Sequence, residues 1–218
     1  MNDIYLGAVY DAMRLIGYND GQFYINIKPK AGYKGIISGP ALTTCGRLVS
    51  KNEDYDKLDN IRLNIYKKEL FKEKPIVLLQ ANDDYCAHSG DITSNIYQSL
   101  GAKGFITDGN VRDIEKIEEI SFPVFCESIN PIDALDYWAL TEYNNPIVIK
   151  NVEISPGDFI YASQDGVIRV KRADHSIFLK NLENILKKEN DARKLIKNIK
   201  GEDFTAEFNK FVTTYGRW

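Results

Sequence analysis

The chain has few cysteines, and none of them follows a recognised spacing. Cys45, Cys86 and Cys126 form no C-x-x-C pair and match no metal-ligand pattern. An odd number of cysteines argues against a disulfide framework, so we expect free thiols in a reducing compartment. A small secreted domain held together by disulfides is therefore excluded.

Long apolar runs and a strong charge of one sign are also missing. No stretch of the 218 residues approaches the ~18 consecutive apolar residues of a membrane span. The first 17 residues carry Asp3, Asp11 and Arg14 instead of a basic and then apolar leader. A net charge of −3 gives no broad attraction to nucleic acid or to an anionic membrane. We expect a cytoplasmic protein with neither kind of partner.

A nucleotide-binding turn is absent as well. No G-x-G-x-x-G motif opens a helix after a predicted strand, because Gly101 and Gly104 follow the end of a helix. This disfavours a methyltransferase. The chain has many lysines, but none lies in the acid–arginine motif described below, so a Schiff-base aldolase has little support.

The middle of the chain alternates between strand and helix patterns, which favours parallel βαβ units. Apolar or β-branched runs at 75–80, 104–107 and 122–126 predict buried strands. Between them, 92–100 shows a helical stripe at Ile92, Ile96 and Leu100, and 111–120 begins with acids suited to a helix N-terminus. The predicted class is α/β.

The flanking regions predict further elements. Residues 1–17 read as an amphipathic helix ending at Gly17, and 56–73 as one polar helix. The strand expected over 35–45 should bend at Gly39-Pro40, because proline belongs at an edge or a bulge. Short strands over 146–170 read as antiparallel hairpins. We divide the chain into a domain at 1–173 and a helical extension at 174–218, which Gly201 interrupts.

Two helix starts carry the residues suited to chemistry. Gly90 and Asp91 open one helix, where unpaired N–H groups can bind a carboxylate and glycine lets a ligand approach closely. Arg112 and Asp113 open the next, and an arginine can grip an organic acid while an aspartate binds a hard cation. Each acid alone could merely cap its helix. Together, at the carboxyl ends of neighbouring strands, the two starts would share a crevice.

The motifs resemble those of the RraA-like family, which includes the 4-hydroxy-4-methyl-2-oxoglutarate aldolases. Glycines, acids and one arginine recur in the family's order over most of the chain. The matching segments are Val9–Met13, Ser38–Thr44, Gly90-Asp91, Gly101–Phe105, Asp108–Asp113, Phe122–Phe125, Pro156–Asp158 and Asp165–Val167.

The resemblance implies a swivelling β/β/α fold and a class II lyase that uses Mg²⁺ or Mn²⁺. It implies that Asp113 binds the metal, that Arg112 contacts a small 2-oxo acid, and that Asp91 orients a metal-bound water. Backbone N–H groups after Gly90, those of Asp91, Ile92 and Thr93, would hold the pyruvate carboxylate. A divalent cation suits this chemistry, because cleavage or decarboxylation leaves an enolate. The family implies a homotrimer or a hexamer.

Some positions depart from the family pattern. Ser163 stands where an acid is common, and we expect a structural consequence. His88 could face the site and transfer protons, or it could contact solvent or backbone. Glu189 is similar to a family glutamate that reaches a neighbouring subunit's site, or it lies on a solvated helix face. His175 is expected at the surface.

The leading interpretation is therefore an aldolase or decarboxylase that releases pyruvate from a 4-hydroxy-2-oxo acid or from oxaloacetate. A non-catalytic regulator that binds an RNA-degrading endonuclease is the alternative, since some family members have that role. Retention of Asp91, Arg112 and Asp113 together supports the lyase, and nothing in the motif marks a nuclease-binding surface.

Overall fold

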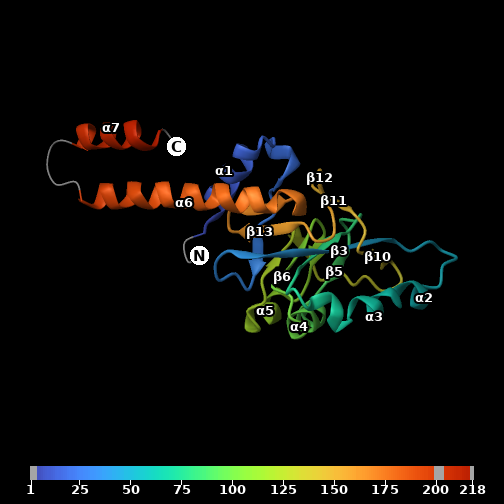
Figure 1. Ribbon diagram of the computed structural model, residues 1–218. Helices are drawn as coiled ribbons and strands as arrows, with labels where there is room; N and C mark the ends of the chain where they lie inside the picture. Colours follow the sequence, from blue (N-terminus) through green and yellow to red (C-terminus); the bar gives the residue numbers. More distant parts are fainter. Residues whose placement is uncertain (1–3, 199–203, 217–218) are drawn as a thin grey trace.

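The computed structural model describes residues 4–198 and 204–216, and a nine-stranded mixed sheet runs through its body (Figure 1). The sheet has one continuous strand order and one branch. In that order the strands are β1 (Tyr24–Ile25), β14 (Gly166–Val170), β13 (Phe159–Ser163), β3 (Ile37–Leu48), β4 (Ile76–Gln80), β6 (Gly104–Thr107), β8 (Val124–Phe125) and β2 (Pro29–Ala31), with β10 (Trp138–Tyr143) also paired to β3.

The long strand β3 joins the two halves of the sheet. Its residues 37–40 pair antiparallel with β13, and its residues 41–45 pair parallel with β4. The strand expected over 35–45 is confirmed as β3, which continues without interruption through Pro40 to Leu48. The Ala41 N–H donates to the Asp158 carbonyl on the β13 side, at 2.7 Å. The Pro40 nitrogen therefore faces the other edge, where pairing with β4 begins only at Ala41.

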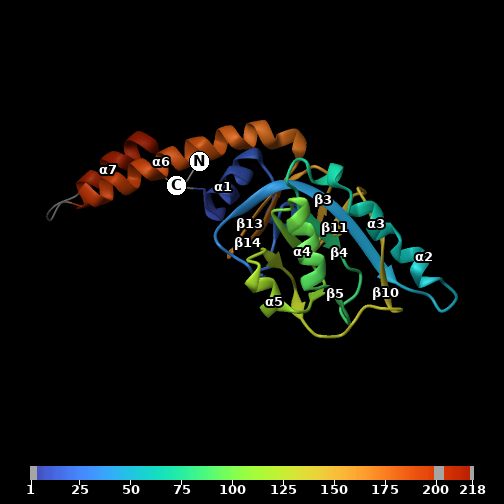
Figure 2. The same ribbon diagram turned by 90° about the horizontal axis from the view of Figure 1, so that it is seen from below.

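The expected βαβαβ alternation is confirmed, with β4, β6 and β8 parallel. Helix α4 (Asp91–Leu100) lies between β4 and β6, and α5 (Ile114–Glu119) lies between β6 and β8. The two helices are in contact and cover the same face (Figure 2). Gly101 ends α4 in the left-handed region, at φ 104°, as expected.

The buried face of α4 differs from the apolar stripe in the sequence. The Tyr97 ring packs 6.2 Å from Phe71 and 5.9 Å from Phe105, measured between ring centroids. Ile92, at the start of the expected stripe, is 70% exposed. The Tyr97 ring is buried against the sheet in place of Ile92, because an aromatic side chain buries more apolar area than an aliphatic one.

Residues 55–71 form three short helical segments instead of one helix. These are α2 (Tyr55–Asp59), α3 (Ile61–Ile65) and the 3₁₀ helix η2 (Lys68–Phe71). Tyr66 leaves the helical region at ψ 23°, so the chain turns there and brings Ile65 and Phe71 into the core. Packing against β10 determines this path, since α2 and α3 both contact that strand.

The hairpins expected over 146–170 are confirmed. Strand β11 (Ile147–Ile149) pairs antiparallel with β12 (Val152–Ile154), and β13 pairs antiparallel with β14. The Ser163 hydroxyl accepts a hydrogen bond from the Asp165 N–H, at 3.1 Å. Ser163 thus closes the turn between β13 and β14, which is the structural role expected for it.

Helices from the two ends of the chain pack together. Helix α1 (Leu6–Ile16) ends at Gly17, which has φ 100°, and it contacts α6 (His175–Asn198). Phe178 and Leu182 of α6 are buried with α1 in one apolar cluster. The rest of α6 extends beyond the body, and α7 (Phe204–Tyr215) runs back beside it (Figure 1). The expected break at Gly201 lies outside the described residues.

His175, expected at the surface, is half-buried at the start of α6. Its ring stacks on Phe159 with 3.4 Å between centroids, and its Nε2 lies 3.2 Å from the Tyr161 hydroxyl. Burial lowers the pKa of His175, so the ring is held in its neutral form. Among the described helices, none combines the length and the hydrophobicity that crossing a membrane requires.

Candidate active site

A second, small parallel sheet places the two helix starts side by side. It consists of β5 (Ala87–Ser89), β7 (Asn110–Val111) and β9 (Ser128–Ile129). Each of these strands follows one strand of the main sheet along the chain, so β5 leads into α4 and β7 leads into α5. Because β5 and β7 pair in register at Ser89 and Val111, the residues after them become neighbours.

Gly90 and the Arg112-Asp113 pair are in close contact, as the sequence predicted. The Arg112 N–H donates to the Ser89 carbonyl at 3.0 Å. A Cβ atom at residue 90 would lie 2.6 Å from the Asp113 Oδ2 and 3.1 Å from the Arg112 Cγ. The absence of a side chain at Gly90 therefore lets the arginine and the aspartate sit against the entry to α4.

The Asp113 carboxylate does not cap its helix. Asp113 has φ 60° and ψ 33°, a left-handed conformation that is uncommon outside glycine, and its carbonyl accepts the N–H groups of Lys116 and Ile117. Its carboxylate instead lies 3.3 Å from the Arg112 Nε and is partly exposed. Strained residues of this kind cluster at functional sites. The simple capping alternative is wrong for Asp113.

The start of α4 offers N–H groups and further oxygen atoms. The first bond along the helix is from the Ser94 N–H to the Gly90 carbonyl, at 3.0 Å, so Asp91, Ile92 and Thr93 have no carbonyl partner in α4. Within the described parts of the chain, no hydrogen bond or ion pair holds the Asp91 carboxylate. These are the conditions under which a helix start binds an anion.

The donor atoms at this point fit a hard divalent cation. Carboxylates of Asp91 and Asp113 lie at neighbouring helix starts, and neither is used as a cap. Oxygen donors suit Mg²⁺ or Mn²⁺ better than a soft metal. The narrow space at Gly90, which a Cβ would fill, keeps the Asp113 carboxylate facing the α4 start.

A cleft of about 370 Å³ opens at Gly90 and Arg112, and its lining does not include Asp91 or Asp113. Its walls come from α2, α3, β5, the α4 start and the loop after β9. The lining residues are Tyr55, Arg62, Ala87, His88, Ser89, Gly90, Thr93, Arg112, Asp133, Ala134 and Leu135. Gly90, Thr93 and Arg112 of the predicted site line this cleft, whereas Ile92 points outward and could contribute only its backbone.

Asp133 is a site residue that the sequence did not reveal. Arg112 Nη1 donates to its Oδ2, and the Leu135 N–H donates to its Oδ1 at 2.7 Å. The Leu135 N–H and then the Arg112 guanidinium lower the pKa of Asp133, so it stays ionised. Asp133 lies in an irregular loop, and no spacing relates it to Arg112. A second arginine, Arg62, reaches the cleft from α3, and no spacing in the sequence relates it to Arg112 either.

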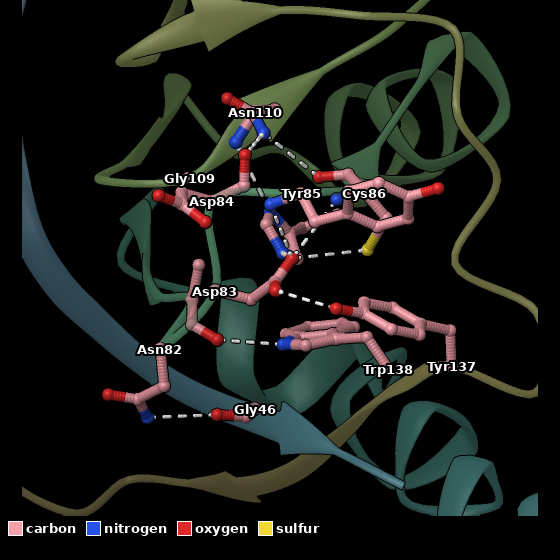
Figure 3. A network of polar contacts seen from close by, with 12 residues as sticks. Gly46, Asn82, Asp83, Asp84, Tyr85, Cys86, Gly109, Asn110, Tyr137 and Trp138 are labelled. Carbon is pink, nitrogen blue, oxygen red and sulfur yellow. Dashed lines mark hydrogen bonds and ion pairs between the residues drawn. The ribbon is translucent and has the colours of Figure 1, made fainter.

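His88 is a buried residue of the cleft lining and belongs to a hydrogen-bonded network centred on Asp83. Figure 3 shows this network around Asp83, Cys86, Asn110 and Trp138. The Asn110 N–H donates to His88 Nδ1 at 3.2 Å, so the proton is on Nε2, which lies 3.0 Å from the Asp83 Oδ2. The ring also meets Trp138 edge-on, with 4.7 Å between centroids. Both ring nitrogens of His88 are therefore hydrogen-bonded within the protein. This favours the alternative in which His88 contacts the backbone over the one in which it transfers protons to a substrate.

Asp83 is the centre of this network. Its Oδ2 also accepts the N–H groups of Tyr85 and Cys86, at 3.0 and 3.1 Å. Asp83, Cys86 and His88 place one possible metal ligand each within 4.8 Å of the others. Burial and then the Asp83 charge raise the pKa of Cys86 to about 12, however, so the thiol stays protonated. Hydrogen bonds already satisfy these three side chains, which is typical of a structural network.

Glu189 pairs with Arg193 on the same helix, at 3.1 Å, and Arg193 also donates to the Tyr5 hydroxyl at 3.1 Å. Within one chain, Glu189 is therefore part of a local helix contact.

Comparisons with known proteins identify relatives of the chain in sequence and in fold. A model of the RraA-like family, described as Aldolase/RraA, matches residues 7–169. A protein of Halalkalibacterium halodurans named "Putative 4-hydroxy-4-methyl-2-oxoglutarate aldolase" is 31% identical over 124 residues, which are 56% of this chain and 55% of that protein. The chain thus spans about half the length of the curated relatives it matches.

Two solved structures have the same fold at lower identity. An uncharacterised protein of Pseudomonas syringae has a TM-score of 0.74 at 18% identity, over 91% of this chain and 90% of that one. RraAS2 of Streptomyces coelicolor, from the RNase ES inhibitor RraA family, has a TM-score of 0.70 at 19% identity, over 88% of this chain and 93% of that one.

Proposed function

This chain belongs to the RraA-like family, and on that premise we propose that it is a divalent-metal-dependent carbon–carbon lyase. The proposed reaction releases pyruvate from a 4-hydroxy-2-oxo acid or from oxaloacetate. The observation that carries the proposal is the contact of Gly90 with Arg112 and Asp113, which leaves an uncapped carboxylate beside the open start of α4.

Each residue of the constellation has a role suited to its position. Asp113, with a carboxylate that no backbone N–H uses as a cap, would hold Mg²⁺ or Mn²⁺. When bound there, such a cation would supply positive charge close to the 2-oxo acid, where negative charge develops as the carbon–carbon bond breaks. Arg112 binds the oxo-acid end of the substrate through its planar guanidinium, and the α4 N–H groups of residues 91–93 bind the carboxylate.

Proton transfer falls to water held by a carboxylate. Asp91 has no competing hydrogen bond among the described residues, so it can orient a water toward the 4-hydroxyl group. His88 cannot replace it, because Asn110 and Asp83 occupy its two nitrogens. When this water takes the hydroxyl proton, the C3–C4 bond can break and C4 becomes the carbonyl carbon of the second product. A proton then returns to C3 to give pyruvate.

The test is pyruvate release from oxaloacetate and from 4-hydroxy-4-methyl-2-oxoglutarate, measured with Mg²⁺ and then with EDTA. We expect release that EDTA abolishes and that Asp113→Ala lowers roughly 10²- to 10³-fold. Glu115→Ala is the matched control, since Glu115 is an exposed acid in the first turn of the same helix. Equal turnover of Asp113→Ala and wild type would refute the proposed site.

The alternative is a non-catalytic regulator of an RNA-degrading endonuclease. It would be favoured if neither compound is cleaved under any metal condition. A homotrimer or hexamer is part of the proposal, and sedimentation velocity would measure it.

A further inference from the structure

A second and larger cleft, of about 530 Å³, lies where β14 and β12 contribute lining residues. It is bounded by the 3₁₀ helices η1 (Asp20–Gln22) and η3 (Arg172–Asp174), by β12, by β14 and by the turn at 155–158. None of its lining residues lines the cleft at Arg112. It is therefore a separate place for a ligand.

A buried arginine forms the floor of this cleft. Arg169, on β14, is only 4% exposed. Its Nη2 donates to the Gln22 carbonyl at 2.9 Å, but its Nε and Nη1 have no hydrogen-bond partner among the residues that the structure describes. A buried guanidinium normally satisfies its five N–H donors, because an unpaired buried donor costs free energy. Arg169 is part of the cleft lining, and two buried nitrogens without a partner next to that space point to an oxyanion as the missing partner.

Asp158 does not provide that partner. Its Oδ2 lies 3.8 Å from the Arg169 Nε, which is beyond hydrogen-bond distance. The two carboxylate oxygens are already used, since the Ser155 N–H donates to Oδ2 and the Arg172 N–H donates to Oδ1, each at 3.0 Å. Asp158 offsets the charge of Arg169 without filling its hydrogen bonds.

Two further cations stand at the exposed rim. The Lys171 Nζ lies 5.4 Å from the centre of the Tyr18 ring, and the Arg172 guanidinium lies over Gly157, where a Cβ would come within 2.9 Å of its Nη1. Among the residues the structure describes, neither side chain has an acidic partner. The acids in the lining are Asp158 and the exposed Glu153, so the cations outnumber them.

We propose that this cleft binds the phosphate group of a small phosphorylated metabolite. A phosphate dianion offers enough oxygens to accept hydrogen bonds from the Arg169 fork and from the rim cations together. Because the cleft is larger than a phosphate ion needs, the rest of the metabolite lies along Tyr18 and the β12 side. The site is independent of the lyase chemistry proposed at Asp113.

Isothermal titration calorimetry at constant ionic strength tests this proposal with inorganic phosphate and glycerol 3-phosphate. We expect saturable binding of both, with the ester binding more tightly. Arg169→Met should weaken binding roughly 10- to 100-fold, as expected for lost charge-assisted hydrogen bonds. The Lys171→Gln/Arg172→Gln double variant should weaken it by at least tenfold.

Two controls make the outcome decisive. Lys187→Gln removes an exposed positive charge of α6 away from the cleft, and Asp113→Ala alters the other site, so both should keep wild-type phosphate affinity. If Arg169→Met does not fold, the rim double variant decides, because both of its side chains are exposed. No saturable binding by the wild type, equal affinity in the rim variant, or tighter binding of citrate than of either phosphate would overturn the assignment.

Discussion

Two groups of acids, at Asp83 and at Asp91 and Asp113, differ in how their oxygens are used. The Asp83 carboxylate is buried and accepts two backbone N–H groups and the His88 ring. The Asp91 and Asp113 carboxylates lie at helix starts, and neither serves as a cap. A satisfied carboxylate holds the fold, whereas an unsatisfied one at an open helix start is available to a ligand. The hydrogen-bond partners, and not the residue type, separate structure from chemistry here.

The largest expected effect comes from filling the space at Gly90. Gly90→Ala places a Cβ 2.6 Å from the Asp113 Oδ2, so the carboxylate must turn away. We expect kcat/KM for pyruvate release to fall roughly 10²-fold, since misplaced catalytic groups cost about this much. The unfolding midpoint should change little, because the closest contact is with the end of the Asp113 side chain and the Arg112 Cγ, at 3.1 Å, needs to shift only slightly. Gly21→Ala is the control, as a Cβ there meets nothing within 4 Å.

Replacing Asp83, whose carboxylate is fully hydrogen-bonded, should lower the stability of the protein. Asp83→Ala leaves the N–H groups of Tyr85 and Cys86 without their acceptor. We expect the free energy of unfolding to drop by about 2 kcal/mol, the usual cost of unpaired buried donors. Urea denaturation measures the drop, and Asp84→Ala is the neighbouring acid to compare. A stability equal to that of wild type would mean that the network does not hold the loop.

A smaller effect is expected at the Arg112–Asp133 pair. Asp133 shares the Arg112 guanidinium with the proposed substrate, and both side chains are partly exposed. Asp133→Asn should therefore lower KM for the oxo acid by up to about fivefold, because exposed ion pairs are weak. Ala134→Ser would serve as a control change in the same cleft wall. A higher KM would show instead that Asp133 positions Arg112 productively.

The smallest expected effect concerns how the stability of the protein depends on pH. Burial lowers the pKa of His88 below its ordinary value of 6.5, more than Asp83 and Asn110 raise it. The unfolded chain then binds the proton more readily, so stability is complete above pH 6.5 and falls as the pH drops from 6.5 toward the folded pKa. His88→Gln should lose less stability between pH 7 and pH 5 than wild type. His175 also has a lowered pKa, so the variant keeps part of the dependence.

The sequence predicted the parallel core and the meeting of Gly90 with Arg112 and Asp113, because periodic strands and helix starts are local signals. It did not predict the course of β3 through Pro40, since that depends on which neighbour pairs at each residue. Asp133 and Arg62 were missed because irregular loops and short helices bring them to the cleft. The position of Ile92 was misjudged, because the large Tyr97 ring decided which face of α4 is buried.

The double pairing of β3 also has a consequence for how the protein is made. Pro40 of β3 lies opposite Phe159 of β13, about 120 positions later in the chain. A ribosome adds roughly 5–20 residues per second, so the first part of β3 waits on the order of ten seconds for its partner. During that interval its edge is open to other chains. Slower synthesis, or truncation before residue 159, should therefore lower the yield of folded protein during expression.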